Sequence, residues 1–247
     1  MKSAGTIIAH RLQETMHSLP LLTYYNERSG ERLDLSAPTL NNWAAKYGNL
    51  FLLDAMLQPG NTVSLPPSNS WHAVAIGLGT ATAGLVISFD EQMSDCVIVE
   101  HDQVLAGDEI ELGEEQAGYA LYGDLFGTTF SFHNEEPPFP FEDLIEVART
   151  MPDNFGHAAP AVSRYHERVD ELLRSGGSGD GAAGEAALPL AGKRYLIQGW
   201  QQQAEQFDAK VLEPLLAGAT VVLVDGLVSA ERLQQIIDSE RVTDVIE

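Results

Sequence analysis

The sequence uses one pattern of predicted secondary structure twice. Each copy reads helix, strand opened by Gly, polar segment, helix, and then a hydrophobic run that follows Ala-Gly. The first copy spans residues 38–90 and the second spans residues 160–225. Repeated alternation of helices and strands is typical of α/β folds, in which a parallel sheet is flanked by helices. The repeat therefore restricts the chain to a doubled α/β architecture with mainly parallel sheets.

Local signals fill in the first part of the chain. Two β-rich runs, residues 21–25 and 32–35, flank a polar turn and predict a hairpin. A long helix is expected after Ser36, because its apolar residues recur at helical spacing. The residues expected on its buried face are Leu40, Trp43, Ala44, Tyr47, Leu50 and Phe51.

The middle of the chain gives the weakest signals. A strand is expected within residues 121–132, and the proline-rich residues 137–140 predict a rigid connector. We expect a first α/β sub-domain at residues 1–140 and a second at residues 141–247. The second includes a Gly/Ala/Ser-rich insertion at residues 176–187, which is expected to be flexible.

The charge of the chain excludes some classes of partner. Of 247 residues, 36 are Asp or Glu and only 14 are Lys or Arg, which gives a formal net charge of −22 at pH 7. Nucleic acids and anionic membranes bind clustered cations, so neither partner is expected. No run approaches the ~18 apolar residues of a membrane helix, and no signal peptide is recognised, so a cytoplasmic location is expected. The one cysteine, Cys96, lies in an apolar run and is expected to be a buried structural thiol.

Two stretches of the sequence resemble the adenylate-forming superfamily, which includes acyl-CoA synthetases and luciferases. The pieces that match are the helix after Ser36, residues 58–63, 65–68 and 83–86, and further along residues 214–223 and 240–243. The layout is also similar to a small uncharacterised actinobacterial family that keeps only the N-terminal portion of such enzymes. This resemblance implies two similar Rossmann-like or flavodoxin-like halves, as in the N-terminal part of acyl-CoA synthetases.

The sequence lacks the catalytic motifs of the adenylate-forming superfamily. A triphosphate must be surrounded by backbone N–H groups, hydroxyls and an ammonium group. Gly127-Thr128-Thr129 and residues 175–184 come nearest to such a loop, but neither contains Lys, and the second contains Asp180. The chain also stops before the family's adenine-binding and ribose-binding motifs and its lysine-bearing lid. We therefore expect no catalytic residue and no cofactor, with ATP, AMP and CoA unsupported by a phosphate loop.

A small-molecule site, if present, is expected beyond the carboxyl ends of the strands, where open parallel sheets bind their ligands. The candidates at the first copy are Ser68, Asn69 and Trp71, and those at the second are Gly199, Trp200 and Gln201. No metal site is expected, because the histidines lack the usual spacing of metal ligands. Of these histidines, His72 is assigned to packing or capping and the segment from His133 to Glu136 to a solvated loop. Lys193 is expected to be exposed.

Two functions remain open from the sequence. The first is a truncated acyl-CoA synthetase-like protein without adenylation activity that acts as an interaction or regulatory module. A homodimer or a protein partner would then cover an open sheet edge. The alternative is a protein that binds a nucleotide or an acyl or carboxylate molecule, or a residual AMP-dependent ligase.

Overall fold

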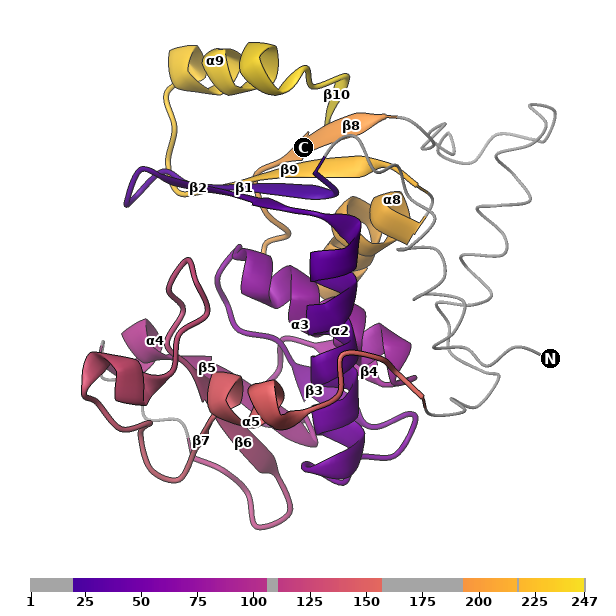
Figure 1. Cartoon of the computed structure of the whole chain (residues 1–247), viewed down its shortest axis with the longest axis vertical. Coiled ribbons are helices and arrows are strands. Elements are labelled where there is room, and N and C mark those ends of the chain that lie inside the picture. The colour runs from indigo at the N-terminus through magenta and orange to yellow at the C-terminus, as the bar shows by residue number, and fades with distance from the viewer. Residues whose placement is uncertain (1–19, 106–110, 157–192, 217, 247) are drawn as a thin grey trace, which may run out of the picture.

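The computed structural model describes residues 20–105, 111–156, 193–216 and 218–246, and these residues form two five-stranded sheets (Figure 1). Sheet A has the strand order β10-β8-β9-β1-β2. Its strands are β1 (Leu22–Asn26), β2 (Glu31–Leu35), β8 (Arg194–Ile197), β9 (Thr220–Asp225) and β10 (Asp244–Ile246). β1 and β2 are antiparallel, and every other neighbouring pair in sheet A is parallel. The predicted hairpin and the predominance of parallel pairing are confirmed.

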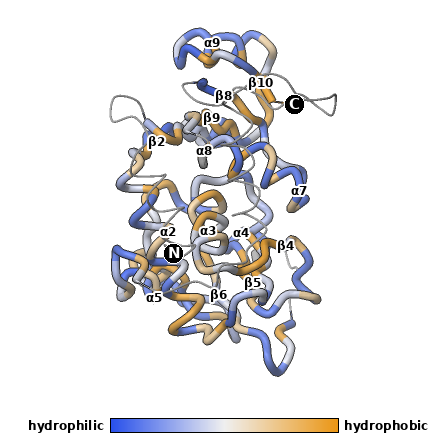
Figure 2. Tube along the Cα trace, turned by 90° about the vertical axis from the view of Figure 1, so that its right-hand side faces the viewer, coloured by the Kyte–Doolittle hydropathy of each residue, from blue (hydrophilic) through white to orange (hydrophobic). Residues whose placement is uncertain are grey.

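Sheet B is parallel throughout, with the strand order β4-β3-β5-β6-β7. Its strands are β3 (Thr62–Ser64), β4 (Val86–Ser88), β5 (Cys96–Glu100), β6 (Ala117–Leu121) and β7 (Glu142–Asp143). Cys96 is fully buried in β5, as the apolar run predicts. The strands of both sheets are largely hydrophobic in Figure 2, as expected for strands that are covered on both faces.

The helices pack between the sheets and on their outer faces. They are α2 (Ala37–Leu53), α3 (Trp71–Thr82), α4 (His101–Leu105), α5 (Leu144–Thr150), α7 (Ala204–Phe207), α8 (Glu213–Leu216) and α9 (Ala230–Glu240). A 3₁₀ helix, η1 (Phe130–His133), and a π-helical turn, η2 (Asp208–Leu212), complete the described elements. In Figure 1, α3 lies between the sheets, α2 runs alongside it from sheet A to sheet B, and α9 covers the outer face of sheet A. Within the described residues, no helix combines the length and the apolar composition that a membrane crossing requires.

The main hydrophobic cluster of the described residues joins the two sheets through α2 and α3. Every residue of α3 is buried, and its glycines allow close approach of neighbouring elements. A Cβ atom on Gly79 would lie 2.9 Å from the backbone oxygen of Ala44 and 3.0 Å from the backbone nitrogen of Gly48, both in α2. Ser36 and Ser70 cap α2 and α3, because each side-chain oxygen accepts a hydrogen bond from a backbone N–H in the first turn.

The repeated unit of the sequence is present in the structure. β3, α3 and β4 form one parallel strand–helix–strand unit, and β8, the helical segment from α7 to α8, and β9 form the other. The predicted fold class is therefore confirmed. The helix expected at the start of the second copy and the insertion at residues 176–187 lie outside the described residues.

β1 pairs with β2 and with β9, which lies near the other end of the chain, and β7 pairs with β6. One expectation about the middle of the chain differs from the structure. The strand expected within residues 121–132 ends at Leu121. Beyond it, Gly123 and Gly127 adopt positive φ values, and Asp124 accepts the backbone N–H of Thr128 at 2.8 Å, so the chain turns instead.

Candidate ligand-binding cleft

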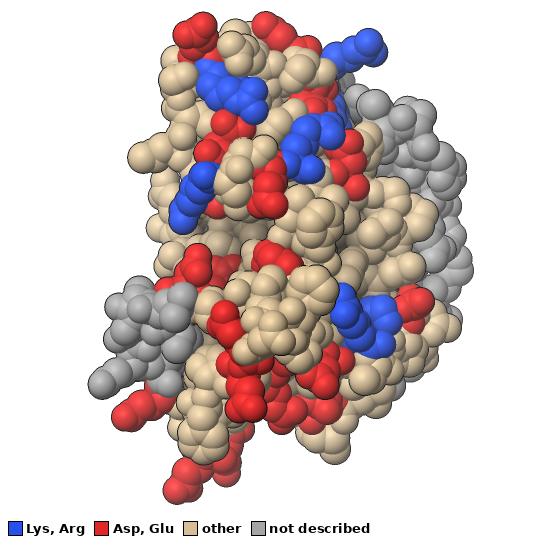
Figure 3. Space-filling model, turned by 60° about the vertical axis from the view of Figure 1, so that its left-hand side comes forward, with Lys and Arg blue, Asp and Glu red and all other residues tan. Residues whose placement is uncertain are grey.

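The carboxyl ends of strands from both sheets converge on one cleft of about 500 Å³, which we name the carboxyl-edge cleft. Sheet A contributes the ends of β1 and β9, and sheet B contributes residues at or just after the ends of β3, β5 and β6. The lining residues are Tyr24, Asn26, Arg28, Pro67, Ser68, Ser70, Glu100, Asp102, Gln103, Tyr122, Gly123 and Asp225. Figure 3 brings this side forward and shows the molecule hollowed between its upper part and its lower part. Such a position is where open α/β sheets bind ligands.

Glu100, the last residue of β5, is the most perturbed acid in the cleft. Its Oε1 atom accepts a very short hydrogen bond from the Ser68 hydroxyl, which follows β3. Burial raises the pKa of Glu100 to about 7, against the opposing effect of the Ser68 hydrogen bond. The nearby charges of Asp102 and Asp225 raise this pKa further, and Arg28 lowers it. The side chain therefore changes its charge close to neutral pH.

Sheet A supplies a carboxylate, a cation and a phenol to the same cleft. Asp225 ends β9, and burial raises its pKa, although Arg28 opposes this with its Nε atom 3.8 Å from Asp225 Oδ2. The Arg28 side chain is 75% exposed, so it sits at the rim. Tyr24 is only 5% exposed, and its hydroxyl makes no hydrogen bond to any described residue. Burial raises the pKa of Tyr24, and the charges of Asp225 and Glu100 raise it further.

Charge is distributed unevenly along the chain. Residues 37–156, which include sheet B, contain half of the 36 acidic residues but only two of the 14 Lys and Arg, namely Lys46 and Arg149. Figure 3 shows the result on one face, where Asp and Glu crowd the lower part and most Lys and Arg lie on the upper part. The cleft therefore opens beside an acidic surface, which disfavours anions at its entrance.

Three of the six residues predicted to bind a ligand lie where the strand-end loops meet. Ser68 lines the cleft, and the Asn69 side chain packs directly on Gly199, where a Cβ atom would come within 2.5 Å of it. The backbone of Gly199 has a φ of +107°, which favours glycine at this contact. The loops that follow β3 and β8 are thus in contact, as expected for neighbouring carboxyl ends.

The other three predicted residues are placed differently. Trp71 is buried and donates its indole N–H to the Leu125 carbonyl at 3.1 Å. Trp200 is fully buried and meets Phe207 edge-on, with ring centroids 4.9 Å apart. Both indoles are therefore parts of the core. Gln201 is exposed, and none of these three residues lines the carboxyl-edge cleft.

Tyr24, Glu100 and Asp225 are not among the residues predicted from the sequence to bind a ligand. A signal was available for the two acids, because each directly follows an apolar run that predicts a strand. An acid at the carboxyl end of a parallel strand points to the ligand-binding edge of the sheet. No comparable signal marks Tyr24, because it lies inside a strand. Only the position of sheet B places it at a cleft and not in the core.

The remaining candidates from the sequence have structural roles. His72 is fully buried, its Nε2 atom lies 2.9 Å from the Asp124 carbonyl oxygen, and burial lowers its pKa to about 4. Asp124 also accepts the Thr128 hydroxyl, so the hydroxyl and N–H of Thr128 are both engaged within its own turn. The His133 ring stacks on Tyr122 with centroids 3.7 Å apart. Lys193 forms an ion pair with Asp244 at 3.0 Å.

No metal centre is apparent in the described segments, where no group of three or more His, Cys, Asp or Glu side chains could hold a metal ion. The second glycine-rich stretch, residues 175–184, lies outside those segments. Among the described residues, the carboxyl-edge cleft is thus where side chains from both sheets meet.

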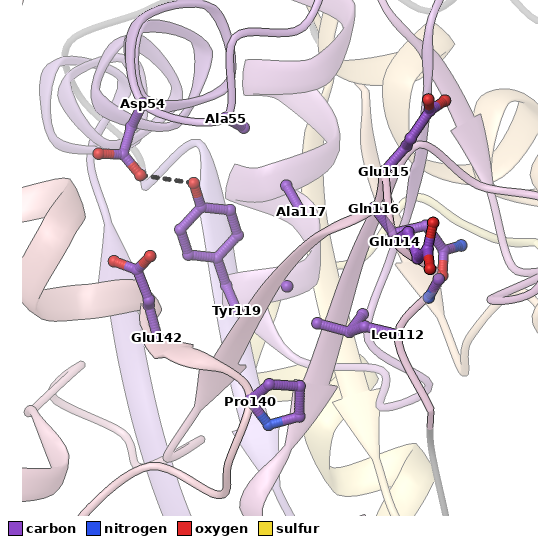
Figure 4. Close-up of a pocket in the computed structure, with 12 residues that line it drawn as sticks. Asp54, Ala55, Leu112, Glu114, Glu115, Gln116, Ala117, Tyr119, Pro140 and Glu142 are labelled. Atoms are coloured by element: carbon purple, nitrogen blue, oxygen red, sulfur yellow. Dashed lines mark hydrogen bonds between the residues drawn. The ribbon is translucent and has the colours of Figure 1, made fainter.

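A second cavity of about 510 Å³, which we name the amino-edge cavity, lies at the opposite edge of sheet B (Figure 4). Asp54, Glu114, Glu115 and Glu142 line it, and no Lys or Arg does. The Tyr119 hydroxyl in this cavity donates a hydrogen bond of 2.6 Å to Asp54, drawn as a dashed line in Figure 4. Parallel sheets seldom bind ligands at this edge, and the only tyrosine hydroxyl in the lining is already satisfied.

Comparison with known proteins identifies one sequence relative of similar length. The chain is 30% identical over 232 residues to a TIGR03089 family protein of Mycobacterium tuberculosis. This alignment covers 92% of this chain and 91% of the relative. A scan against models of known protein families finds no match.

Solved structures with the same fold are acyl-CoA synthetases and their relatives. An acyl-CoA synthetase from Brucella canis superimposes with a TM-score of 0.68 at 18% identity, over 98% of this chain and 46% of that chain. Acetoacetyl-CoA synthetase from Streptomyces lividans superimposes with a TM-score of 0.68 at 16% identity, over 98% of this chain and 42% of that chain. The N-terminal domain of FACL13 from Mycobacterium tuberculosis superimposes with a TM-score of 0.58 at 18% identity, over 99% of this chain and 62% of that chain. The chain thus spans about half the length of these proteins, and at these identities the likeness concerns the fold.

Proposed function

The chain belongs to the TIGR03089 family, and we propose that it binds a small molecule in the carboxyl-edge cleft without adenylating carboxylic acids. The observation that carries this proposal is the composition of the cleft. Glu100, Asp102 and Asp225 line it, and Arg28 is the only cation in the lining. The cleft volume of about 500 Å³ is in the range of small-molecule sites.

Electrostatics argue against a triphosphate in this cleft. Two like charges 4 Å apart repel by about 4 kcal/mol at an effective dielectric constant of about 20. A triphosphate would meet this repulsion at Glu100 and Asp225, whereas Arg28 is exposed and already lies near Asp225. Stabilising a pentavalent phosphorus would require several donors directed at one point. The lining instead contains three carboxylates, and Arg28 is its only cation.

The direct test of missing adenylation is ATP–pyrophosphate exchange with a panel of short, long and aromatic carboxylic acids. We expect no exchange above the rate without acid, because the cleft repels the polyphosphate. A full-length acyl-CoA synthetase assayed under the same conditions provides the positive control. Acid-dependent exchange by this chain would contradict the proposal.

The binding half of the proposal is tested by screening metabolites for a concentration-dependent rise in melting temperature. We expect a rise in melting temperature that is lost in Ser68→Ala and in Tyr24→Phe. Shifts that survive both substitutions would place binding elsewhere and contradict the proposal.

A second candidate function is an interaction module, and an open sheet edge supports it. Within the described residues β10 pairs only with β8, and its Val245 is 42% exposed. A second copy of the chain could extend sheet A at this edge, as unpaired edge strands commonly do. Light scattering at micromolar concentration should then give the mass of a dimer. A monomer mass would contradict the homodimer.

A further inference from the structure

The carboxyl-edge cleft contains a carboxylate that lacks a cationic partner. Glu100 accepts a hydrogen bond from Ser68 but forms no ion pair with a Lys or Arg among the described residues. Arg28 lies nearer to Asp225, at 3.8 Å, and projects from the rim with most of its side chain exposed. Glu100 is partly buried, and removing a carboxylate from water is costly unless a cation or several hydrogen-bond donors accompany it. A cation bound in the cleft would therefore be stabilised by Glu100.

Tyr24 adds an independent indication of a ligand. It lines the cleft and is 95% buried, and its hydroxyl has no hydrogen-bond partner in the described part of the chain. The hydroxyl lines the cleft and no described protein group occupies it, so it is free to exchange a hydrogen bond with a ligand. The ligand that fits should therefore present a hydrogen-bonding group at the phenol as well as a positive charge near Glu100.

We propose that the carboxyl-edge cleft binds molecules through an ammonium group, which is held by Glu100, Asp225 and the Tyr24 hydroxyl. This inference rests on the proposed function, since it assigns the ligand class of the same cleft. An ammonium group carries up to three N–H donors, and the two carboxylates and the phenol oxygen are acceptors. Charge-assisted hydrogen bonds of this kind are stronger than neutral ones. The ligand is thus a small amine.

Other ligand classes fit the described residues less well. A phosphate or carboxylate would need cations, and only Arg28 is present, close to Asp225. A divalent metal ion would need three or more suitable side chains, and no such group exists in the described segments. The amino-edge cavity is also acidic, but its Tyr119 hydroxyl is bonded to Asp54, so nothing there calls for a ligand. It serves as an internal control for charge alone.

The titration of Glu100 makes amine binding dependent on pH. Burial together with the charges of Asp102 and Asp225 raises its pKa to about 7, against the opposing effects of Ser68 and Arg28. An ammonium group binds the ionised carboxylate, whose population rises about tenfold between pH 6 and pH 8 for a pKa of about 7. The affinity for an amine should therefore increase up to about tenfold over this interval, and binding below pH 7 should release a proton. Tyr24 remains neutral throughout, since burial raises its pKa.

The test uses probes that share a phenylethyl or a pentyl group and differ in the charge of the group attached to it. One set is 2-phenylethylamine, 2-phenylethanol and 3-phenylpropionate, and a second set is pentylamine, pentanol and hexanoate. Each probe and AMP are titrated calorimetrically into the full chain at pH 6 and at pH 8. We expect saturable binding of at least one amine, tighter at pH 8, and no binding of the matched alcohol, acid or nucleotide.

Variants locate the binding site. Glu100→Gln keeps the shape of the side chain and should weaken amine binding at least tenfold and abolish its pH dependence. Tyr24→Phe should weaken it several-fold. The matched control, Glu115→Gln, removes a carboxylate from the amino-edge cavity and should leave amine binding unchanged. Circular dichroism of each variant establishes that it is folded.

The outcomes separate the two proposals. Binding of an acid or of AMP that is lost in Tyr24→Phe would overturn the amine inference and leave a small-molecule function for the cleft. Amine binding that Glu100→Gln does not change, or that Glu115→Gln reduces equally, would also overturn the inference. Failure of every probe and of the metabolite screen to bind would overturn both the ligand class and the proposed function.

Discussion

Replacing Glu100 with Gln should make the protein more stable, and increasingly so as the pH rises. In the folded protein the pKa of Glu100 is about 7, whereas its ordinary value is 4.5. Each pKa unit corresponds to about 1.4 kcal/mol, so ionising this partly buried carboxyl at alkaline pH costs about 3 kcal/mol of stability. Gln stays neutral, and its side-chain oxygen can still accept the Ser68 hydroxyl. The substitution should therefore recover about 3 kcal/mol at pH 8.

The sign follows from proton linkage. The folded pKa lies above the unfolded pKa, so between pH 4.5 and pH 7 the folded chain binds more protons than the unfolded chain. The contribution of Glu100 to the free energy of unfolding is complete below pH 4.5 and is lost as the pH rises through 7. The wild type and the variant should therefore be similar at pH 5 and differ most at pH 8.

Urea denaturation followed by tryptophan fluorescence measures this difference, since Trp71 and Trp200 are buried in the core. The free energy of unfolding is determined at pH 5, 6, 7 and 8 for the wild type, Glu100→Gln and the exposed control Glu115→Gln. The control should follow the wild type at every pH. Parallel pH profiles for Glu100→Gln and the wild type would refute the argument that Glu100 is partly removed from water without a cationic partner.

Two further substitutions test the packing that positions the cleft. Gly79→Ala should destabilise the protein by about 2 kcal/mol, measured by urea denaturation, because the new methyl group would press on the backbone of Ala44 and Gly48. Helix propensity alone predicts a gain in stability instead, and such a gain would show that α2 and α3 can separate. Arg194→Ala should cost about 3 kcal/mol, because it removes a buried ion pair of 2.6 Å and leaves Glu240, which is nearly buried, with fewer partners. A loss below 1 kcal/mol on urea denaturation would mean that Arg32, 2.8 Å from Glu240, compensates fully.

Local sequence patterns sufficed for most elements of the fold. The hairpin of β1 and β2, the buried face of α2 and the strand–helix–strand repeat all depend on residues close together in the chain. The pairing of β1 with β9 joins residues about 200 positions apart, and nothing local specifies it. The division into two sub-domains at residue 140 stays a prediction.

The candidate site was predicted only in part for the same physical reason. The carboxyl ends of the strands were identified as the place to look, and Ser68 lies in the cleft. Trp200 was selected for its position after a strand, but its contact with Phe207 places it in the core. Glu100 and Tyr24 meet in one cleft because two separate sheets face each other, and that arrangement is decided by packing through α2 and α3 rather than by any motif.

Crystal structures after separate soaks with 2-phenylethylamine and with ATP test the central claim most directly. The account predicts ordered density for the amine in the carboxyl-edge cleft, with its nitrogen within hydrogen-bonding distance of Glu100 and Asp225 and no nucleotide there. An ordered triphosphate in that cleft, or an amine bound only at other positions, would contradict it.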